Sequence, residues 1–280
     1  MKIYQFSGAG NDFVVIDGRE GDVSAVREVP RLEAQCKEYK TDGLMILGSG
    51  DAEVDFTMEF YNPDGSGGMM CGNGGRCIVA FADYLGIRPA EGERTAEGVT
   101  AAPGVFLFRA PDGLHTGDIL DRPEDGLWTV RIKMIDVQGI TPMLGGYFLN
   151  TGTRHFVKFV DDVEQVDVDA EGKALRWDPA FAPIGTNVNF VHVASDGLHV
   201  RTFEKGVEGE TLACGTGLTA AAIAAAFAGA RPPNGPRSSR AIAVRARQDW
   251  LSVDFTPCPD EKFTDVYLTG PARLVRIAGA

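Results

Sequence analysis

Two cysteines in this sequence stand in the same unusual setting. Cys71 is followed by Gly-Asn-Gly and Cys214 by Gly-Thr-Gly, and each motif leads into an apolar segment of about three helical turns that ends at a glycine. A cysteine at a helix N-terminus lies among backbone N–H groups that lack an intrahelical partner, at the positive end of the helix dipole. Both effects favour the thiolate and lower the pKa of a cysteine below its ordinary value of about 8.5.

The same backbone N–H groups can hold a carboxylate, and glycine lets the backbone approach a ligand closely. Two such sites around one small carboxylate would place a thiolate on one side of its α-carbon and a thiol on the other. Removing a proton from one face and returning one to the opposite face inverts that carbon by acid–base catalysis. No cofactor is needed if the carbanion is held electrostatically in a dry site. The motif pair therefore predicts a cofactor-independent isomerase, with Cys71 and Cys214 as its acid–base groups.

Other readings of these motifs are weaker. Cys36, Cys77 and Cys258 lack the glycine context, and we expect them to act as small buried apolar side chains. Five residues separate Cys71 from Cys77, with no second pair at zinc-site spacing, so we expect no metal site. The segment from Gly215 to Ala220 formally fits the dinucleotide fingerprint, but no buried strand precedes it and no acidic residue follows at the required distance.

The elements around the two motifs are mostly strands. Several segments alternate apolar and polar residues between Gly, Pro, Asn and Asp, the pattern of half-buried strands. The expected strands are Val14–Ile16, Leu44–Leu47, Phe56–Tyr61, Trp128–Met134, Phe156–Val160, Val188–Val193 and Leu251–Phe255. The two cysteine motifs break this pattern in the same way, each with a helix. The sequence therefore predicts a strand-rich α+β fold, antiparallel in large part.

The two motifs lie about half the chain apart, which favours an internal duplication. We expect two similar lobes, each with a thiol at the N-terminus of its central helix. The expected N-terminal lobe consists of residues 1–137 and 272–280 and carries Cys71, and the expected C-terminal lobe consists of residues 138–271 and carries Cys214.

Composition and charge restrict the expected partners and the expected cellular compartment. The formal net charge is −12 and the chain has no run of Lys and Arg, so nucleic acid is not an expected partner. The N-terminal residues lack a signal-peptide core and the most apolar stretch, Leu218–Ala230, is too short to span a bilayer, so no membrane association is expected. Five cysteines without a targeting segment favour reduced thiols in the cytoplasm.

Beyond the chemistry of its thiols, the sequence resembles the diaminopimelate epimerase family over nearly its whole length. Three stretches carry the resemblance, of which the last two are highly specific together. They are Ser7–Phe13, then Phe60–Ser66 with Met70–Cys77, and Phe203–Gly206 leading through Glu210–Gly217.

The resemblance implies two similar lobes, each a curled, mostly antiparallel sheet around a central helix, with the active site in the cleft between them. It implies an amino-acid substrate, diaminopimelate, and no cofactor or metal, with a homodimer as a possible assembly. In this family the two cysteines exchange the proton, the N–H groups that follow each cysteine hold the reacting carboxylate, and a histidine lies beside the thiols. The matching substrate-binding positions are Asn11, Asn62, Gly72, Asn73, Asn187, Glu204, Lys205, Gly215 and Thr216, with His155 in support.

Three positions depart from the family pattern. Lys205 stands where the family commonly has Arg, Thr153 where it has Asn, and Glu208 is an extra residue before Gly-Glu-Thr. Lysine offers a point charge where arginine grips a carboxylate through two parallel hydrogen bonds. These departures bear on which amino acid is bound. Two alternatives therefore stay open: a racemase of another amino acid of the proline or histidine type, and a binding protein without turnover.

Overall fold

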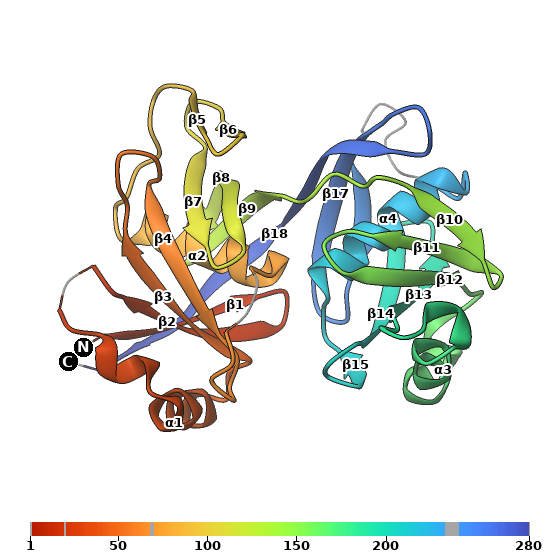
Figure 1. The fold of residues 1–280 in the computed structure, drawn as a ribbon, viewed down its shortest axis with the longest axis horizontal. Coiled ribbons are helices and arrows are strands. Elements are labelled where there is room, and N and C mark those ends of the chain that lie inside the picture. Colours follow the sequence, from red (N-terminus) through yellow and green to blue (C-terminus); the bar gives the residue numbers. More distant parts are fainter. Residues whose placement is uncertain (1, 20, 68–69, 233–240, 280) are drawn as a thin grey trace. The chain divides into compact units, whose positions relative to one another are not determined.

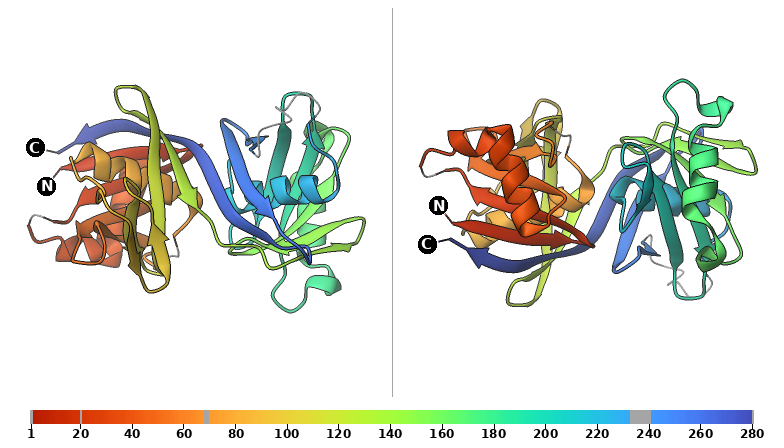
Figure 2. Two further views of the ribbon diagram at one scale, coloured as in Figure 1. Left: turned by 90° about the horizontal axis from the view of Figure 1, so that it is seen from above. Right: turned by 90° about the horizontal axis from the view of Figure 1, so that it is seen from below.

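The computed structural model describes residues 2–19, 21–67, 70–232 and 241–279. The chain separates into two compact units, one formed by residues 1–132 and 270–280 and the other by residues 133–269. Figures 1 and 2 show the strands of each unit wrapped around that unit's helix.

Eight strands of the first unit form a closed ring. Its order is β1-β2-β3-β4-β7-β8-β9-β18, and β18 pairs back onto β1. Only the β2–β3 and β4–β7 pairs are parallel, and the rest of the ring is antiparallel. The strands are β1 (Ile3–Gly8), β2 (Asn11–Asp17), β3 (Gly43–Ser49), β4 (Phe56–Tyr61), β7 (Phe106–Ala110), β8 (Gly113–Glu124), β9 (Leu127–Lys133) and β18 (Phe263–Ala278). A separate hairpin joins β5 (Arg94–Ala96) and β6 (Val99–Ala101).

The second unit repeats this topology. In each unit the chain runs through an antiparallel hairpin, a helix crossover to a parallel strand, a second hairpin, and then the cysteine helix as a crossover to another parallel strand. Its sheet order is β18-β17-β16-β14-β13-β12-β11-β10, with β15 paired to β14. The strands are β10 (Ile140–Met143), β11 (Gly146–Asn150), β12 (Arg154–Phe159), β13 (Asn187–Val193), β14 (Leu198–Glu204), β15 (Gly209–Thr211), β16 (Ile242–Arg245) and β17 (Trp250–Pro257). The prediction of two similar lobes is confirmed by this repeated strand order.

The two cysteine helices are the cores of their units. Helix α2 (Gly72–Tyr84) is buried from Gly72 through Asp83 and packs against β1, β2, β3 and β8. Helix α4 (Gly215–Phe227) is apolar on every side and packs against β11–β14, β16 and β17. A helix that is hydrophobic all round is stable only when it is enclosed. The apolar sequences after the cysteines therefore require the surrounding strands.

The seven expected strands are all present, and their ends lie within two residues of the predicted ones, except that β2 starts three residues before Val14. Two further helices, α1 (Val29–Tyr39) and α3 (Val168–Arg176), were not predicted and form the other crossovers of the two units. Both helices are short, carry many charged residues and bury only three residues each, so their sequences are less distinctive than those of the two apolar cysteine helices. Short 3₁₀ turns at Ser24–Arg27, Val163–Gln165 and Pro179–Phe181 complete the elements.

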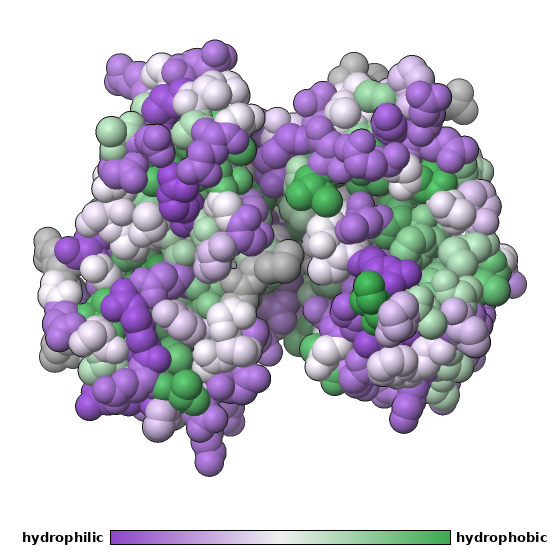
Figure 3. All heavy atoms as spheres, in the orientation of Figure 1, coloured by the Kyte–Doolittle hydropathy of each residue, from purple (hydrophilic) through white to green (hydrophobic). Residues whose placement is uncertain are grey.

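The surface carries the acidity of the chain. On the face shown in Figure 3, hydrophilic side chains spread over both units and apolar ones occur in small groups. No helix in the described ranges is both long and apolar enough to cross a membrane.

Candidate active site

Cys71 is the residue that starts helix α2. Its backbone is extended (φ −99°, ψ 150°), and its Sγ accepts the N–H of Gly74 at 3.2 Å. Its carbonyl oxygen accepts the N–H of Gly75, which closes the first turn. The thiol therefore lies at the positive end of the helix dipole, where a negative sulfur is favoured.

Two asparagines lie beside this first turn. Asn73 belongs to the turn itself, and its Nδ2 donates to the Oδ1 of Asn11, at the start of β2, at 2.5 Å. Asn62 follows β4, and its hydrogen bonds lie within its own turn, where Nδ2 donates to Ser66 Oγ at 3.0 Å. The first unit thus brings Cys71, Gly72, Asn73 and Asn11 together, while Asn62 closes a neighbouring loop.

Cys214 starts helix α4 in the same way. Its backbone is extended (φ −114°, ψ 106°), its carbonyl accepts the N–H of Leu218, and only 8% of the residue is exposed. Its Sγ lies 3.4 Å from the hydroxyl oxygen of Thr216. Both thiols therefore occupy equivalent positions in two topologically equivalent units.

The second glycine of each motif makes room for protein atoms. A Cβ on Gly217 would lie 2.4 Å from Asn189 Oδ1 and 3.3 Å from the ring of His155. A Cβ on Gly74 would lie 3.2 Å from the sulfur of Cys71. We expected glycine here so that the backbone can approach a ligand closely. The packing of side chains directly against the first turn is a second reason for glycine at these positions.

His155 is a fully buried side chain that is linked to Cys214 through Thr216. Its Nδ1 lies 3.0 Å from the Nδ2 of Asn189, which also donates to the carbonyl of Phe156. Because an amide nitrogen only donates, Nδ1 of His155 must accept, and the proton of the neutral ring sits on Nε2. Burial lowers the pKa of His155 to about 3, so the ring is neutral near pH 7.

The Nε2 proton of His155 points toward two hydroxyl groups. Nε2 lies 2.9 Å from the Oγ1 of Thr153 and 2.9 Å from that of Thr216. The Thr216 hydroxyl is in turn within reach of Cys214 Sγ. The histidine therefore orients the threonine that contacts the thiol, and it does so without a charge.

Three of the residues expected to bind the far end of the substrate lie at the end shared by β13 and β14, namely Asn187, Glu204 and Lys205. Asn187 donates both amide protons internally, to Thr153 Oγ1 and to the carbonyl of Arg154, while its Oδ1 accepts the backbone N–H of Lys205. Glu204 accepts the hydroxyl proton of Thr211 at 2.9 Å. The second unit therefore joins these residues to the site of Cys214 through Thr153.

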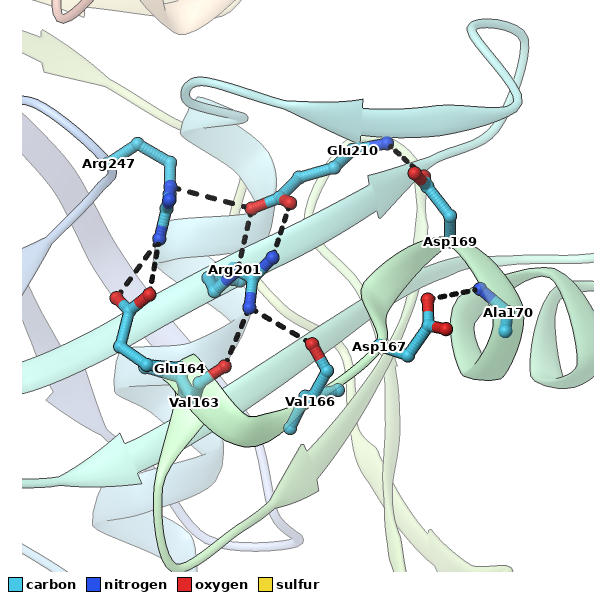
Figure 4. A network of polar contacts seen from close by, with 9 residues as sticks. All are labelled: Val163, Glu164, Val166, Asp167, Asp169, Ala170, Arg201, Glu210 and Arg247. Carbon is cyan, nitrogen blue, oxygen red and sulfur yellow. Dashed lines mark hydrogen bonds and ion pairs between the residues drawn. The ribbon is translucent and has the colours of Figure 1, made fainter.

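An ion-pair network holds the strand that leads to Cys214 (Figure 4). Arg201 of β14 makes two hydrogen bonds to Glu210 of β15, at 2.7 and 2.6 Å, and also donates to the carbonyls of Val163 and Val166. The backbone N–H of Glu210 donates to Asp169 of α3. The guanidinium of Arg247 also pairs with the carboxylate of Glu210. The backbone N–H of Arg247 donates to the carbonyl of Leu212. The segment before the thiol is fixed by side chains and backbone together.

The other three cysteines differ from the two helix-start thiols. Cys36 and Cys77 are buried, and burial raises the pKa of each thiol, most strongly for Cys77, which lies inside α2. Cys258 is half-buried and lies 3.3 Å from the hydroxyl of Thr264. A thiol with a raised pKa is a poor base at neutral pH, which argues against Cys36 and Cys77. Of the five cysteines, Cys71 and Cys214 are the two that start a helix.

Comparison with known proteins places the chain in a family. A sequence model of the diaminopimelate epimerase family matches residues 3–93 and 147–274. The chain belongs to the diaminopimelate epimerase family. Both cysteine motifs and every other residue assigned to the site above lie within the matched ranges.

Curated relatives in this family extend over almost the whole chain. A diaminopimelate epimerase of Flavobacterium psychrophilum is 36% identical, with 98% of both chains covered. The corresponding protein of Chlorobaculum tepidum is 38% identical over 96% of this chain and 97% of its own. That of Aquifex aeolicus is 39% identical over 96% of this chain and 94% of its own.

Solved structures share the fold at low sequence identity. A PhzF-family phenazine biosynthesis protein from Bacillus anthracis superposes with a TM-score of 0.71 at 11% identity, covering 99% of this chain and 98% of that one. A probable proline racemase from Agrobacterium radiobacter K84 gives 0.64 at 15% identity, covering 100% and 92%. The fold expected from the sequence is confirmed by these structures.

Several residues of the site were not identified from the sequence. Asn189 and Thr202 face each other across β13 and β14. Thr202 Oγ1 donates to Asn189 Oδ1 at 3.0 Å and so orients the amide that contacts His155. Polar residues at fully buried strand positions are the signal that could have revealed them, because a buried amide needs hydrogen-bond partners. Asp42, which is exposed, and Arg76, which lies in α2, were also missed, and they are linked to the site through Asn11 and Asn73. In the described ranges, no group of three metal-ligating side chains is found.

Proposed function

We propose that this protein interconverts LL- and meso-2,6-diaminopimelate by proton transfer at the α-carbon, in the formation of lysine and peptidoglycan precursors. The observation that carries the proposal is the position of two thiols at the starts of two enclosed helices in topologically equivalent units. Full-length relatives named diaminopimelate epimerase at 36–39% identity support the substrate.

Each proton is moved by one of the two thiols. The thiolate of one cysteine removes the α-proton from one face, and the electron pair left on carbon spreads into the adjacent carboxylate. The thiol of the other cysteine then gives its proton to the opposite face, which inverts the carbon and leaves that sulfur as thiolate. The reverse reaction exchanges the two roles. In this proposal Cys71 and Cys214 act on one α-carbon.

The reacting carboxylate gains negative charge as the proton leaves. We assign its binding to the backbone N–H groups of Gly72 and Asn73 in one unit and of Gly215 and Thr216 in the other. The first N–H groups of a helix lack intrahelical partners and point along the dipole toward an anion. Fixed donors of this kind stabilise the transition state without having to reorganise.

The distant amino-acid group is assigned to the remaining polar residues. Lys205 would pair with the distal carboxylate and Glu204 with the distal ammonium, since the charges are complementary. Asn187 has no free amide proton, because both are donated internally, so it would serve the ligand only as an acceptor through Oδ1. Asn11 and Asn62 are assigned to the same end of the substrate.

We also propose that the enzyme acts in the cytoplasm. Its catalytic groups are free thiols, and the cytoplasm is the compartment that keeps thiols reduced. We propose the homodimer as an alternative to the monomer, and light scattering of the purified protein distinguishes the two by mass.

Isotope exchange tests the mechanism. In deuterated water, product formed from unlabelled substrate is expected to carry deuterium at the inverted carbon, while substrate recovered early carries little. Cys71→Ala and Cys214→Ala are each expected to abolish epimerisation, whereas Cys36→Ala and Cys258→Ala leave it largely intact. Substantial epimerisation by either of the first two variants would refute the assignment, and rapid labelling of recovered substrate would instead indicate one exchangeable base.

A further inference from the structure

A row of four polar side chains crosses the first unit beside the start of α2. Arg76 Nη2 donates to Asn73 Oδ1 at 2.9 Å, and Asn73 Nδ2 donates to Asn11 Oδ1 at 2.5 Å. Asn11 Nδ2 then donates to Asp42 Oδ2 at 3.2 Å. The row runs from a fully buried guanidinium to an exposed carboxylate.

The two ends of the row have only one hydrogen-bonding role each. A guanidinium only donates and an ionised carboxylate only accepts, whereas the two ends of an asparagine amide are nearly equal in shape. Arg76 therefore requires the oxygen of Asn73 to face it, and Asp42 requires the nitrogen of Asn11 to face it. Reversing the Asn11 amide would bring nitrogen against nitrogen on one side and oxygen against the carboxylate on the other. Both contacts would be repulsive.

The anchors of the row are themselves held. Arg76 also donates to the carbonyl oxygens of Gly72 and Pro271, at 3.1 and 3.3 Å. The Oδ2 of Asp42 also accepts the backbone N–H of Asp12 at 2.9 Å. A separate backbone hydrogen bond, from Asp42 N to the carbonyl of Asp12 at 2.7 Å, does not depend on the Asp42 side chain. The orientation of Asn11 is therefore fixed from both directions by groups that cannot reverse.

We propose that Asp42 and Arg76 are positioning residues that fix the direction in which the Asn11 amide presents its remaining N–H and lone pair to the substrate. This inference rests on the proposed function, in which Asn11 binds the distal part of diaminopimelate. Asp42 makes no contact with the reacting carbon in this proposal and acts through Asn11. Because the contact is made equally in the ground state and the transition state, its loss raises KM and leaves kcat nearly unchanged.

Asp42→Ala is the variant that tests the proposal, because Asp42 is exposed and its backbone tie to Asp12 remains. Its expected effect is a rise in KM of about tenfold, the scale of one hydrogen bond to a charged group, with kcat within about twofold. The matched control is Asp51→Ala, which removes an exposed carboxylate that accepts the backbone N–H groups of Glu53 and Val54 in another loop of the same unit. That control is expected to keep the wild-type KM.

A double-mutant cycle separates positioning from general structural damage. If Asp42 acts through Asn11, then Asp42→Ala has no further effect on KM in an Asn11→Ala background. Losses that add in the double variant, or an unchanged KM in Asp42→Ala, would overturn the inference.

A second measurement does not depend on turnover. The side-chain amide signal of Asn11 in an ¹⁵N-labelled sample, assigned by its disappearance in Asn11→Ala, is expected to shift in Asp42→Ala while that of Asn62 stays in place. An unmoved Asn11 signal would overturn the positioning role. Wild-type protein that fails to epimerise diaminopimelate would refute the proposed function alone, since the amide signal still reports on the row.

Discussion

Lys205 is the residue on which the choice of substrate depends most. Its backbone N–H donates to Asn187, so the backbone from which its side chain extends is held by the polar cluster that also contains Thr153. A site built to satisfy charged groups rejects analogues that lack them, because its own buried polar groups are left unpaired. Specificity is therefore expected to be strict.

Turnover of a substrate panel measures this directly. We expect LL- and meso-diaminopimelate to react, and proline, lysine and the DD isomer to react little or not at all. Lys205→Ala is expected to weaken kcat/KM by about 2–3 kcal/mol, the scale of a charged hydrogen bond, and Lys205→Arg to retain much of it. Faster racemisation of proline or histidine would show that the substrate is another amino acid, while the two-thiol mechanism would stand.

The buried side chain of His155 makes the unfolding free energy of the protein depend on pH. Its pKa is lowered by burial from 6.5 to about 3 in the folded protein, so between these values the unfolded chain binds more protons and acid favours unfolding. Lowering the pH from 7 to 5 is expected to cost about 2 kcal/mol of unfolding free energy through this one group. Urea titrations at both pH values measure the loss, and His155→Gln is expected to remove that share of it. An equal loss in the variant would contradict this, and His199→Gln serves as the control.

At the scale of elements, the start of α4 is closely packed. Asn189 and His155 occupy the space in which a side chain on Gly217 would lie. A Cβ at the third residue of the helix would therefore force its neighbours to shift.

Gly217→Ala tests this packing. Alanine normally favours a helix over glycine, but a Cβ placed 2.4 Å from Asn189 Oδ1 forces a shift in the first turn. We expect a loss of about 1–3 kcal/mol in unfolding free energy, the usual effect of overpacking, together with reduced epimerisation. Gly92→Ala, whose Cβ would meet no atom within 4 Å, is expected to be neutral. A stabilised Gly217→Ala protein would show that Asn189 yields easily.

The sequence predicted those elements whose pattern is strong. Strand β4 alternates buried and half-buried residues along its whole length and was identified with its observed ends. The start of α2 at Gly72 was harder to locate, because glycine disfavours helices and the apolar segment begins only at Cys77. Helix α3 was not predicted because it is short and about half of its residues are charged. Its one clear start signal is Asp167, which caps the helix by accepting the N–H of Ala170.

The candidate site was predictable in its motifs and less so in its supporting residues. Cys71 and Cys214 follow from residue type and spacing within a few positions. Asp42 meets Asn11 where β3 pairs with β2, and Thr216 meets His155 where α4 packs against β12, so both contacts join segments far apart in the chain. No local pattern carries that information.

At the scale of the whole molecule, the last strand completes the first unit. Residues 270–280 belong to this unit, where β18 pairs with β9 and β1 and closes the ring. Deleting the chain from residue 274 onward would remove most of the pairing with β1 and leave its hydrogen-bonding edge open.

Hydrogen exchange measured by mass spectrometry is expected to show faster exchange in β1 and α2 of this truncated protein. Exchange in α4 and its surrounding strands is expected to stay unchanged, because their unit is formed by residues 133–269. Equal loss of protection in both units would contradict the separate closure of the first.

This arrangement reverses the usual order of events during synthesis. Domains generally fold as they leave the ribosome, N-terminal part first. Here the second unit is one continuous segment, whereas the first unit also needs residues 270–280, which follow the second unit in the chain. A nascent chain therefore carries β1 and β9 with open edges until these residues have been made, and the unit that starts first is the last to close.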